Sequence, residues 1–183
     1  MRLFFALPLP SEMKEKLRPT LDEARKVSGG GVGFTKLEQL HFTLAFLGEQ
    51  PAADEALAAG ESLRESAAFD LVLSGVGAFP STMRPRVLWI GAREGASELM
   101  AAAERLRAAL EQRGFKLEER KFRPHLTLGR VRPQGEGGAK RALAVIPPGE
   151  LARCTVRGAC LMQSVLGGRS GATHTVVRMF PFR

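Results

Sequence analysis

One four-residue phrase occurs twice in this chain of 183 residues and constrains its fold more than any other feature. The phrase reads His-x-Thr-Leu and begins at His41 and again at His125, although the chain has only three histidines. Both copies lie in segments rich in apolar and β-favouring residues, at 40–47 and 122–131, which predicts a strand for each. Because residues two apart on a strand point to the same face, each copy would place an imidazole beside a threonine hydroxyl.

The similarity extends beyond the phrase itself. The 84-residue offset between the two histidines also carries residues 2–6, RLFFA, onto residues 86–90, RVLWI. A helix-like segment follows each apolar run, then a His-x-Thr strand, a second helix-like segment and a further strand. Two copies are too few for a solenoid, so we predict one domain over 1–183 with two lobes built from repeats 1–80 and 86–182. The alternative is two ordinary buried strands that happen to carry histidine.

Apolar periodicity gives the coarse order of helices and strands. Pro19 should kink the first helix or end its first half. Helices alternate with strands, but no long parallel βαβ series is required. We therefore predict an α+β fold, bilobal and pseudo-two-fold, with two largely antiparallel sheets flanking a central active-site groove and helices outside. Helices are expected at 11–27, 51–68 and 96–113, and strands at 69–79, 87–92, 152–166 and 173–182.

Composition narrows the class of protein. With 44% hydrophobic residues the chain can bury a full core, and no apolar stretch approaches the length needed to cross a bilayer. The apolar start is short, contains Pro8 and lacks a cleavage site, so a buried first strand is expected rather than a secretory signal. Cys154 and Cys160 lie in one predicted strand with Cα atoms about 20 Å apart, too far for a disulfide. This usage of cysteine predicts a reduced, cytoplasmic protein. A monomer is the expected state.

Charge is distributed unevenly along the chain. Residues 1–80 carry 8 Lys and Arg against 11 Asp and Glu, a net of −3, whereas residues 81–183 carry 19 against 8, a net of +11. Most of the basic residues are arginine, whose planar guanidinium suits phosphate oxygens. A basic half favours a polyanionic partner such as RNA, but a solvated basic face with a bias toward arginine would look the same. Charge therefore indicates phosphate only in combination with the histidines.

Two paired imidazoles and hydroxyls favour chemistry at a phosphate. A neutral histidine can remove a proton from water while a protonated one gives a proton to the departing oxygen. The hydroxyls of Thr43 and Thr127 can donate to the non-bridging oxygens as their charge changes. The histidines lack partners at helical ligand spacing and the cysteines lack companions, so no metal is expected. His174 has no threonine two residues later and is expected to be a packed or surface residue.

These motifs resemble those of a known family. Residues 41–49, HFTLAFLGE, and residues 124–130, PHLTLGR, resemble the paired signatures of the two-histidine (2H) phosphoesterases. Within that superfamily the chain is most similar to the LigT/ThpR branch, the RNA 2′,3′-cyclic phosphodiesterases, historically named 2′-5′ RNA ligases. The resemblance implies a bilobal fold and metal-free, cofactor-free hydrolysis of a terminal 2′,3′-cyclic phosphate on RNA, such as a tRNA fragment, leaving a 2′-phosphate.

The resemblance also implies roles for individual residues. His41 matches the donor of a proton to the leaving 3′ oxygen, and His125 matches the base that activates water. Thr43 and Thr127 match the residues that hold the phosphoryl oxygens. Arg130 resembles a family arginine near the phosphate, yet strand alternation turns it away from His125 unless the strand ends or bulges near Gly129. Arg123, which alternation places on the His125 face, competes for that role, and Phe46 and Trp89 are open to core packing or to stacking a base.

Other functions remain open at this point. No K-x-D-G run is present, so ligation with a nucleotide-charged lysine is not expected, and any joining of RNA ends would be the hydrolytic step in reverse. A second enzyme hypothesis keeps the chemistry but takes a small cyclic nucleotide or an ADP-ribose cyclic phosphate. A third hypothesis is a non-catalytic RNA-binding module with the same fold and basic half.

Overall fold

A computed structural model describes residues 1–119, 121–167 and 172–183 of the chain. Four α-helices and two short 3-10 helices are described: α1 (Ser11–Val27), η1 (Leu37–Gln39), α2 (Asp54–Gly60), η2 (Glu61–Glu65), α3 (Ala96–Gln112) and α4 (Glu136–Val145). The strands are β1 (Arg2–Pro8), β2 (Val32–Phe34), β3 (His41–Glu49), β4 (Phe69–Pro80), β5 (Pro85–Glu94), β6 (His125–Val131), β7 (Glu150–Val156), β8 (Gly158–Leu166) and β9 (Ala172–Pro181).

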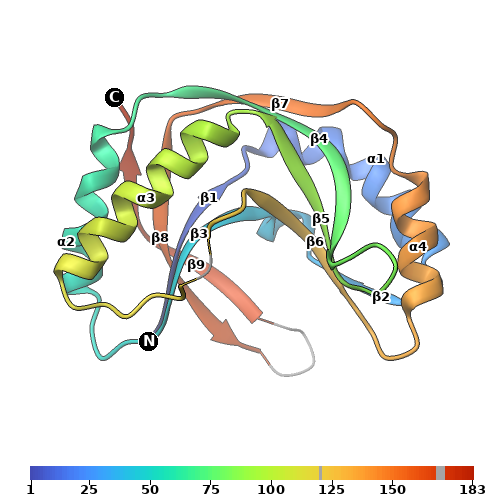
Figure 1. Cartoon of the computed structure of the whole chain (residues 1–183), viewed down its shortest axis with the longest axis horizontal. Coiled ribbons are helices and arrows are strands. Elements are labelled where there is room, and N and C mark those ends of the chain that lie inside the picture. Colours follow the sequence, from blue (N-terminus) through green and yellow to red (C-terminus); the bar gives the residue numbers. More distant parts are fainter. Residues whose placement is uncertain (120, 168–171) are drawn as a thin grey trace.

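The strands form one curled, antiparallel sheet that arches between two groups of helices (Figure 1). The strand order is β7-β4-β5-β6-β3-β1-β8-β9, and β2 pairs with β6 beside β3. The two halves of the sheet meet at β3 and β6, where Phe42 pairs with Leu126. The predicted α+β class with largely antiparallel strands is confirmed. The two predicted sheets are the two halves of one sheet, because this central pair joins them.

The order of strands is symmetric about the β3–β6 junction. Outward from the junction run β3, β1, β8 and β9 on one side and β6, β5, β4 and β7 on the other. Each half contains strands from both predicted repeats, since β4 lies beside β5 and β8 lies beside β1. In Figure 1, α2 and α3 lie together at one end of the sheet and α1 and α4 at the other. The repeats 1–80 and 86–182 stay a prediction, and their strands interleave rather than forming one half each.

The main core lies on the face of the sheet that carries the helices. Phe42 and Leu126 are completely buried in this core, which includes residues from all four α-helices. On the opposite face the described residues form a small buried cluster of Phe4, Ala6, Cys160 and Met162. We call this second side the helix-free face.

A helix end at Pro19, one of the two predicted effects of that residue, and one predicted strand were wrong. α1 runs unbroken through Pro19, because its apolar stripe, including Leu17 and Leu21, is buried in the core and outweighs one missing backbone hydrogen bond. The predicted strand 152–166 is two strands that divide at Arg157. Cys154 and Cys160 therefore lie on different strands, and both are free thiols as expected.

Candidate active site

The β3–β6 junction brings the two His-x-Thr copies next to each other. Phe42 and Leu126 pair across the junction with their side chains in the core, so the residues on either side of them point to the helix-free face. In antiparallel register, His41 lies across from Thr127 and Thr43 across from His125. The two histidines are then diagonal neighbours, a relation that spans about 7–8 Å in a regular ladder. That separation suits two groups acting on one phosphate.

A β-bulge follows the threonine in both copies. In the β1–β3 ladder, Ala6 pairs with Thr43 but Phe5 pairs with Ala45, so Leu44 is an extra residue. In the β5–β6 ladder the shift between Leu88 and Trp89 makes Leu128 extra in the same way. The bulges reverse the alternation of the residues that follow. They return two side chains to the helix-free face at matching positions, Phe46 in one half and Arg130 in the other.

Both imidazoles are held by the same local hydrogen bond. The Nδ1 of His41 lies 2.7 Å from the carbonyl oxygen of Gln39, and the Nδ1 of His125 lies 2.6 Å from the carbonyl oxygen of Arg123. A carbonyl only accepts, so each Nδ1 carries the proton and Nε2 is the nitrogen left for chemistry. In each case the carbonyl belongs to the residue two positions before the histidine.

His41 is enclosed on its side of the junction. Its ring lies 5.2 Å from Phe4 and 5.5 Å from His174, centroid to centroid, with the two imidazoles perpendicular. Burial lowers the pKa of His41, the Gln39 carbonyl opposes that change, and the positive charges of His174 and Lys14 lower the pKa further. The uncharged imidazole is therefore favoured at His41.

His125 has different neighbours. Phe79 meets its ring edge-on, with the centroids 4.9 Å apart. Trp89 pairs with Thr127 in the ladder and lies over Gly77, where the indole occupies the position that any Cβ would need. The indole Nε1 is buried and has no partner among the described residues. An aromatic wall of Phe79 and Trp89 therefore borders the second copy.

The hydroxyls and the arginines are available to a ligand. Thr43 and Thr127 are half-buried, and within the described residues neither hydroxyl forms a hydrogen bond. Arg130 is exposed on the helix-free face. Regular alternation would have turned it to the core face, but the bulge at Leu128 reverses the alternation before Arg130. Arg123 precedes β6 and lies outside the ladder, so strand alternation does not place its side chain.

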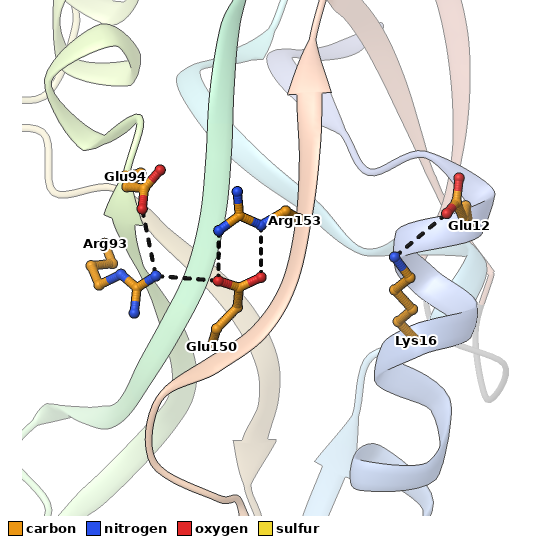
Figure 2. Close-up of polar contacts among 6 residues, drawn as sticks. All are labelled: Glu12, Lys16, Arg93, Glu94, Glu150 and Arg153. Atoms are coloured by element: carbon orange, nitrogen blue, oxygen red, sulfur yellow. Dashed lines mark hydrogen bonds and ion pairs between the residues drawn. The ribbon is translucent and has the colours of Figure 1, made fainter.

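Ion pairing separates these arginines from others in the basic half. Figure 2 shows Arg93 of β5 and Arg153 of β7 sharing Glu150, with Arg153 bonded at 2.8 Å through both Nε and Nη2. In the part of the chain that the structure describes, Arg123 and Arg130 form no ion pair. Both arginines flank the second His-x-Thr-Leu copy, and no carboxylate among the described residues neutralises their positive charge.

The described residues do not form a metal site, and their surface hollows lie away from the two motifs. The described residues contain no group of three or more His, Cys, Asp or Glu side chains that could hold a metal ion. Two surface hollows, one beside α1 and η1 and one near the β7–β8 connection, include none of the predicted site residues. No helix among the described residues is long and apolar enough to cross a membrane.

Sequence reasoning missed several neighbours of the two motifs. Nothing in the spacing of Phe4 or Phe79 separates them from ordinary core phenylalanines. His174 was expected to be packed or on the surface, but it lies against His41. Phe46, for which core packing was one interpretation, is 62% exposed, whereas Trp89 is half-buried.

Comparison with known proteins identifies the family and similar folds. Residues 8–168 match the 2′-5′ RNA ligase superfamily. An Archaeoglobus fulgidus protein named RNA 2′,3′-cyclic phosphodiesterase is 40% identical over 135 residues, which cover 72% of this chain and 73% of that protein. A crystal structure from Thermus thermophilus has a TM-score of 0.80 and 31% identity, covering 99% of this chain and 97% of that one. Escherichia coli LigT complexed with 3′-AMP has a TM-score of 0.77 and 29% identity, covering 99% and 97%.

Proposed function

We propose that this chain, which belongs to the 2′-5′ RNA ligase superfamily, hydrolyses the terminal 2′,3′-cyclic phosphodiester of RNA to a 2′-phosphomonoester. The observation that carries the proposal is the β3–β6 junction, where two histidines with free Nε2 atoms flank one small area of the helix-free face. The relatives that match most of the chain are named for this activity, and LigT has been solved with a nucleotide.

The mechanism needs one proton removed and one supplied. The Nε2 of His125 takes a proton from water, and the water oxygen forms a bond to phosphorus. The bond from phosphorus to the 3′ oxygen breaks, and Nε2–H of His41 gives its proton to that oxygen. Thr43 and Thr127 donate to the two non-bridging oxygens, whose negative charge increases in the transition state. Return of a proton from His125 to His41 through solvent completes the cycle.

The environment of His41 bears on this assignment. Burial lowers its pKa, which disfavours the protonated form that an acid requires. A bound cyclic phosphate carries a negative charge beside the ring and favours the imidazolium again. His41 therefore acts as an acid chiefly in the substrate complex, where the phosphate restores the proton.

Arg130 is the arginine that we assign to the substrate phosphate. The bulge at Leu128 supports it, and its guanidinium has no competing ion pair within the described residues. Arg123 contributes its carbonyl to His125, and its side chain is a second candidate for the phosphate. Phe46 occupies the matching position in the other half, where its exposed ring offers a surface on which a base can stack.

Product analysis tests the reaction directly. Purified protein is incubated with a short RNA that ends in a 2′,3′-cyclic phosphate, and the phosphorus NMR spectrum is followed with and without EDTA and ATP. We expect the cyclic signal to be replaced by that of a 2′-phosphomonoester under all conditions. A 3′-phosphomonoester, or an absolute requirement for a metal or for ATP, would refute the proposed chemistry.

The competing hypotheses predict different substrates. Faster turnover of 2′,3′-cyclic mononucleotides or of an ADP-ribose cyclic phosphate than of short cyclic-ended RNA would favour a small-molecule phosphodiesterase. RNA binding without turnover would favour a non-catalytic module. The pairing of two histidines with Thr43 and Thr127 supports the enzyme over the non-catalytic module. Binding alone does not need two matched imidazoles that can carry protons.

The same site can also join RNA ends. With a 5′-hydroxyl of RNA in place of water, the same displacement forms a bond from phosphorus to the 5′ oxygen and breaks the bond to the 3′ oxygen, which joins two ends through a 2′-5′ bond without ATP. We further propose that the protein acts as a monomer in the cytoplasm on tRNA fragments or other cleaved RNA. Sedimentation at micromolar concentration tests the first part, and sequencing of RNA ends bound by His125→Ala tests the second.

A further inference from the structure

The third histidine of the chain belongs to a compact cluster of rings. His174 lies on β9 with its ring centroid 5.0 Å from that of Phe4 and 5.5 Å from that of His41, edge-on to both. Phe4 also contacts His41 at 5.2 Å, so each of the three rings touches the other two. The Nδ1 of His174 is buried without a hydrogen-bond partner in the described part of the chain. A buried polar atom of this kind has a cost in stability that a phenylalanine would avoid.

Gln39 connects this cluster to the support of His41. Its carbonyl oxygen accepts the hydrogen bond from Nδ1 of His41, and its side-chain Nε2 donates to the carbonyl oxygen of Ala172 at 3.1 Å. Ala172 begins β9, two residues before His174. One residue thus fixes both the catalytic ring and the strand that carries the neighbouring ring.

The second half of the site has no equivalent histidine. His125 is bordered by the edge of Phe79, which can fill space but cannot carry charge. Packing alone would therefore not require an imidazole beside His41. This asymmetry singles out His174, which the proposed mechanism does not use.

We propose that His174 is a positioning residue, which clamps the His41 imidazole against Phe4 so that Nε2 of His41 stays aimed at the substrate phosphate. The proposal rests on the proposed function, in which His41 acts through Nε2. It adds that protons on the two imidazoles are coupled, because the ring centroids lie only 5.5 Å apart and like charges at that distance repel.

Few other groups among the described residues affect this pair. Lys14 on α1 also disfavours a proton on His41, and its Nζ is held 2.7 Å from the carbonyl oxygen of Glu38. From η1 the Gln39 carbonyl favours the imidazolium, and from β1 the pair meets only Phe4, which is uncharged. Opposite His174 on β8 lies Ser164, which does not titrate in this range.

Three variants test the proposal. His174→Ala removes the clamp, His174→Phe keeps a ring but removes the charge, and Thr175→Ala alters the next, exposed residue of β9 as a matched control. Turnover is measured with a 2′,3′-cyclic mononucleotide. The protonation and tautomer of His41 are followed by nitrogen NMR without substrate, where three histidines give few signals. Thermal unfolding of each variant establishes that it is folded.

We expect His174→Ala to lower kcat by about 10- to 100-fold with little change in KM, since a loosened catalytic group is misplaced rather than lost. In this variant the looser ring should keep its hydrogen bond to the Gln39 carbonyl for only part of the time, so the Nε2–H tautomer of His41 should appear beside the Nδ1–H tautomer. His174→Phe should recover most of kcat, and its His41 should titrate as a single group rather than as one of a coupled pair. Thr175→Ala should match the wild type in both measurements.

Turnover and the NMR signals of His41 distinguish failure of the positioning role from failure of the proposed function. Wild-type kcat together with an unchanged His41 tautomer in His174→Ala would overturn the positioning role. If the wild-type protein turned over no cyclic phosphate, the proposed function would fail, and the tautomer of His41 in substrate-free His174→Ala would still decide the clamp. An identical His41 titration in wild type and His174→Phe would contradict the coupling.

Discussion

The two halves of the candidate site share their local geometry and differ in their surroundings. Each has a histidine held by the carbonyl two residues earlier and a threonine followed by a bulged leucine. Around His41 the neighbours are Phe4 and a second imidazole, whereas around His125 the neighbour is Phe79. After the bulge, one half presents Phe46 to the helix-free face and the other presents Arg130.

The two histidines differ chemically through their neighbours rather than through the repeated phrase. The repeated phrase supplies two equivalent proton carriers, which by themselves cannot be told apart. Neighbours that the two copies do not share then lower the pKa of His41, and β6 carries Arg130 at the position where β3 carries Phe46. The two imidazoles therefore differ in their surroundings, but the lowered pKa alone would not make His41 the acid; that role depends on the substrate phosphate, whose negative charge favours the imidazolium again.

The largest effect is expected from removing either histidine. His41→Ala and His125→Ala should each lower kcat by about 10²–10⁴-fold, the usual contribution of a general acid or base. The comparison predicts that the two variants differ in pH dependence: His41→Ala should lose the alkaline limb of the profile and His125→Ala the acidic limb. Loss of the same limb in both would contradict the assignment of different roles.

Removing a hydroxyl is expected to cost somewhat less. Thr43→Val and Thr127→Val keep the shape of the side chain and should each reduce kcat by about 10²–10³-fold, as for one donor to a transition-state oxygen. Serine at either position should restore most of the activity, because it returns the hydroxyl. Steady-state kinetics on a cyclic mononucleotide measures both changes. Valine variants as active as the wild type would remove the threonines from the mechanism.

The arginine should act mainly on binding. Arg130→Ala should raise KM by about 10- to 100-fold, because a hydrogen bond to a charged group is worth about 1.5–3 kcal/mol. Lys140→Ala on α4 removes the same charge from an exposed position away from the motif and is the matched control. Equal effects of the two substitutions would mean that net charge, rather than the position of Arg130, governs affinity.

The smallest effect is a displacement along the pH axis. Burial lowers the pKa of His41 in the free protein, so the alkaline limb of kcat/KM should fall at a lower pH than an ordinary histidine would give. The phosphate of bound substrate raises that pKa, so the alkaline limb of kcat should lie at higher pH. Stopped assays across the pH range compare the two limbs. Coincident limbs would show that the phosphate leaves the charge on His41 unchanged.

Part of this architecture could be predicted because the His-x-Thr-Leu phrase occurs twice. The spacing of the two phrases predicted matching strands, and the helices at 11–27 and 96–113 follow from apolar periodicity that packing then reinforced. The strand pairing that interleaves the repeats could not be read from the sequence, because each strand has the same alternation whichever partner it takes.

The surroundings of the site were less accessible to sequence reasoning. The bulge at Leu128 determines which face of the sheet carries Arg130. A bulge depends on how two strands align, so it cannot be predicted from the sequence of one strand. His174 lies 133 residues from His41, and contact between them arises only when β9 closes the sheet beyond β8 and β1. Neighbours brought together by tertiary structure, rather than by the motif, were therefore the part that sequence could not predict.

The most direct test is to follow the three histidines by NMR while adenosine 2′-monophosphate, the expected type of product, is added. The account predicts that the Nε2 signals of His41 and His125 both change and saturate with the same Kd, since one phosphate contacts both rings. A change at only one of the two histidines, or saturation with two different Kd values, would contradict the claim that they share a single phosphorus atom.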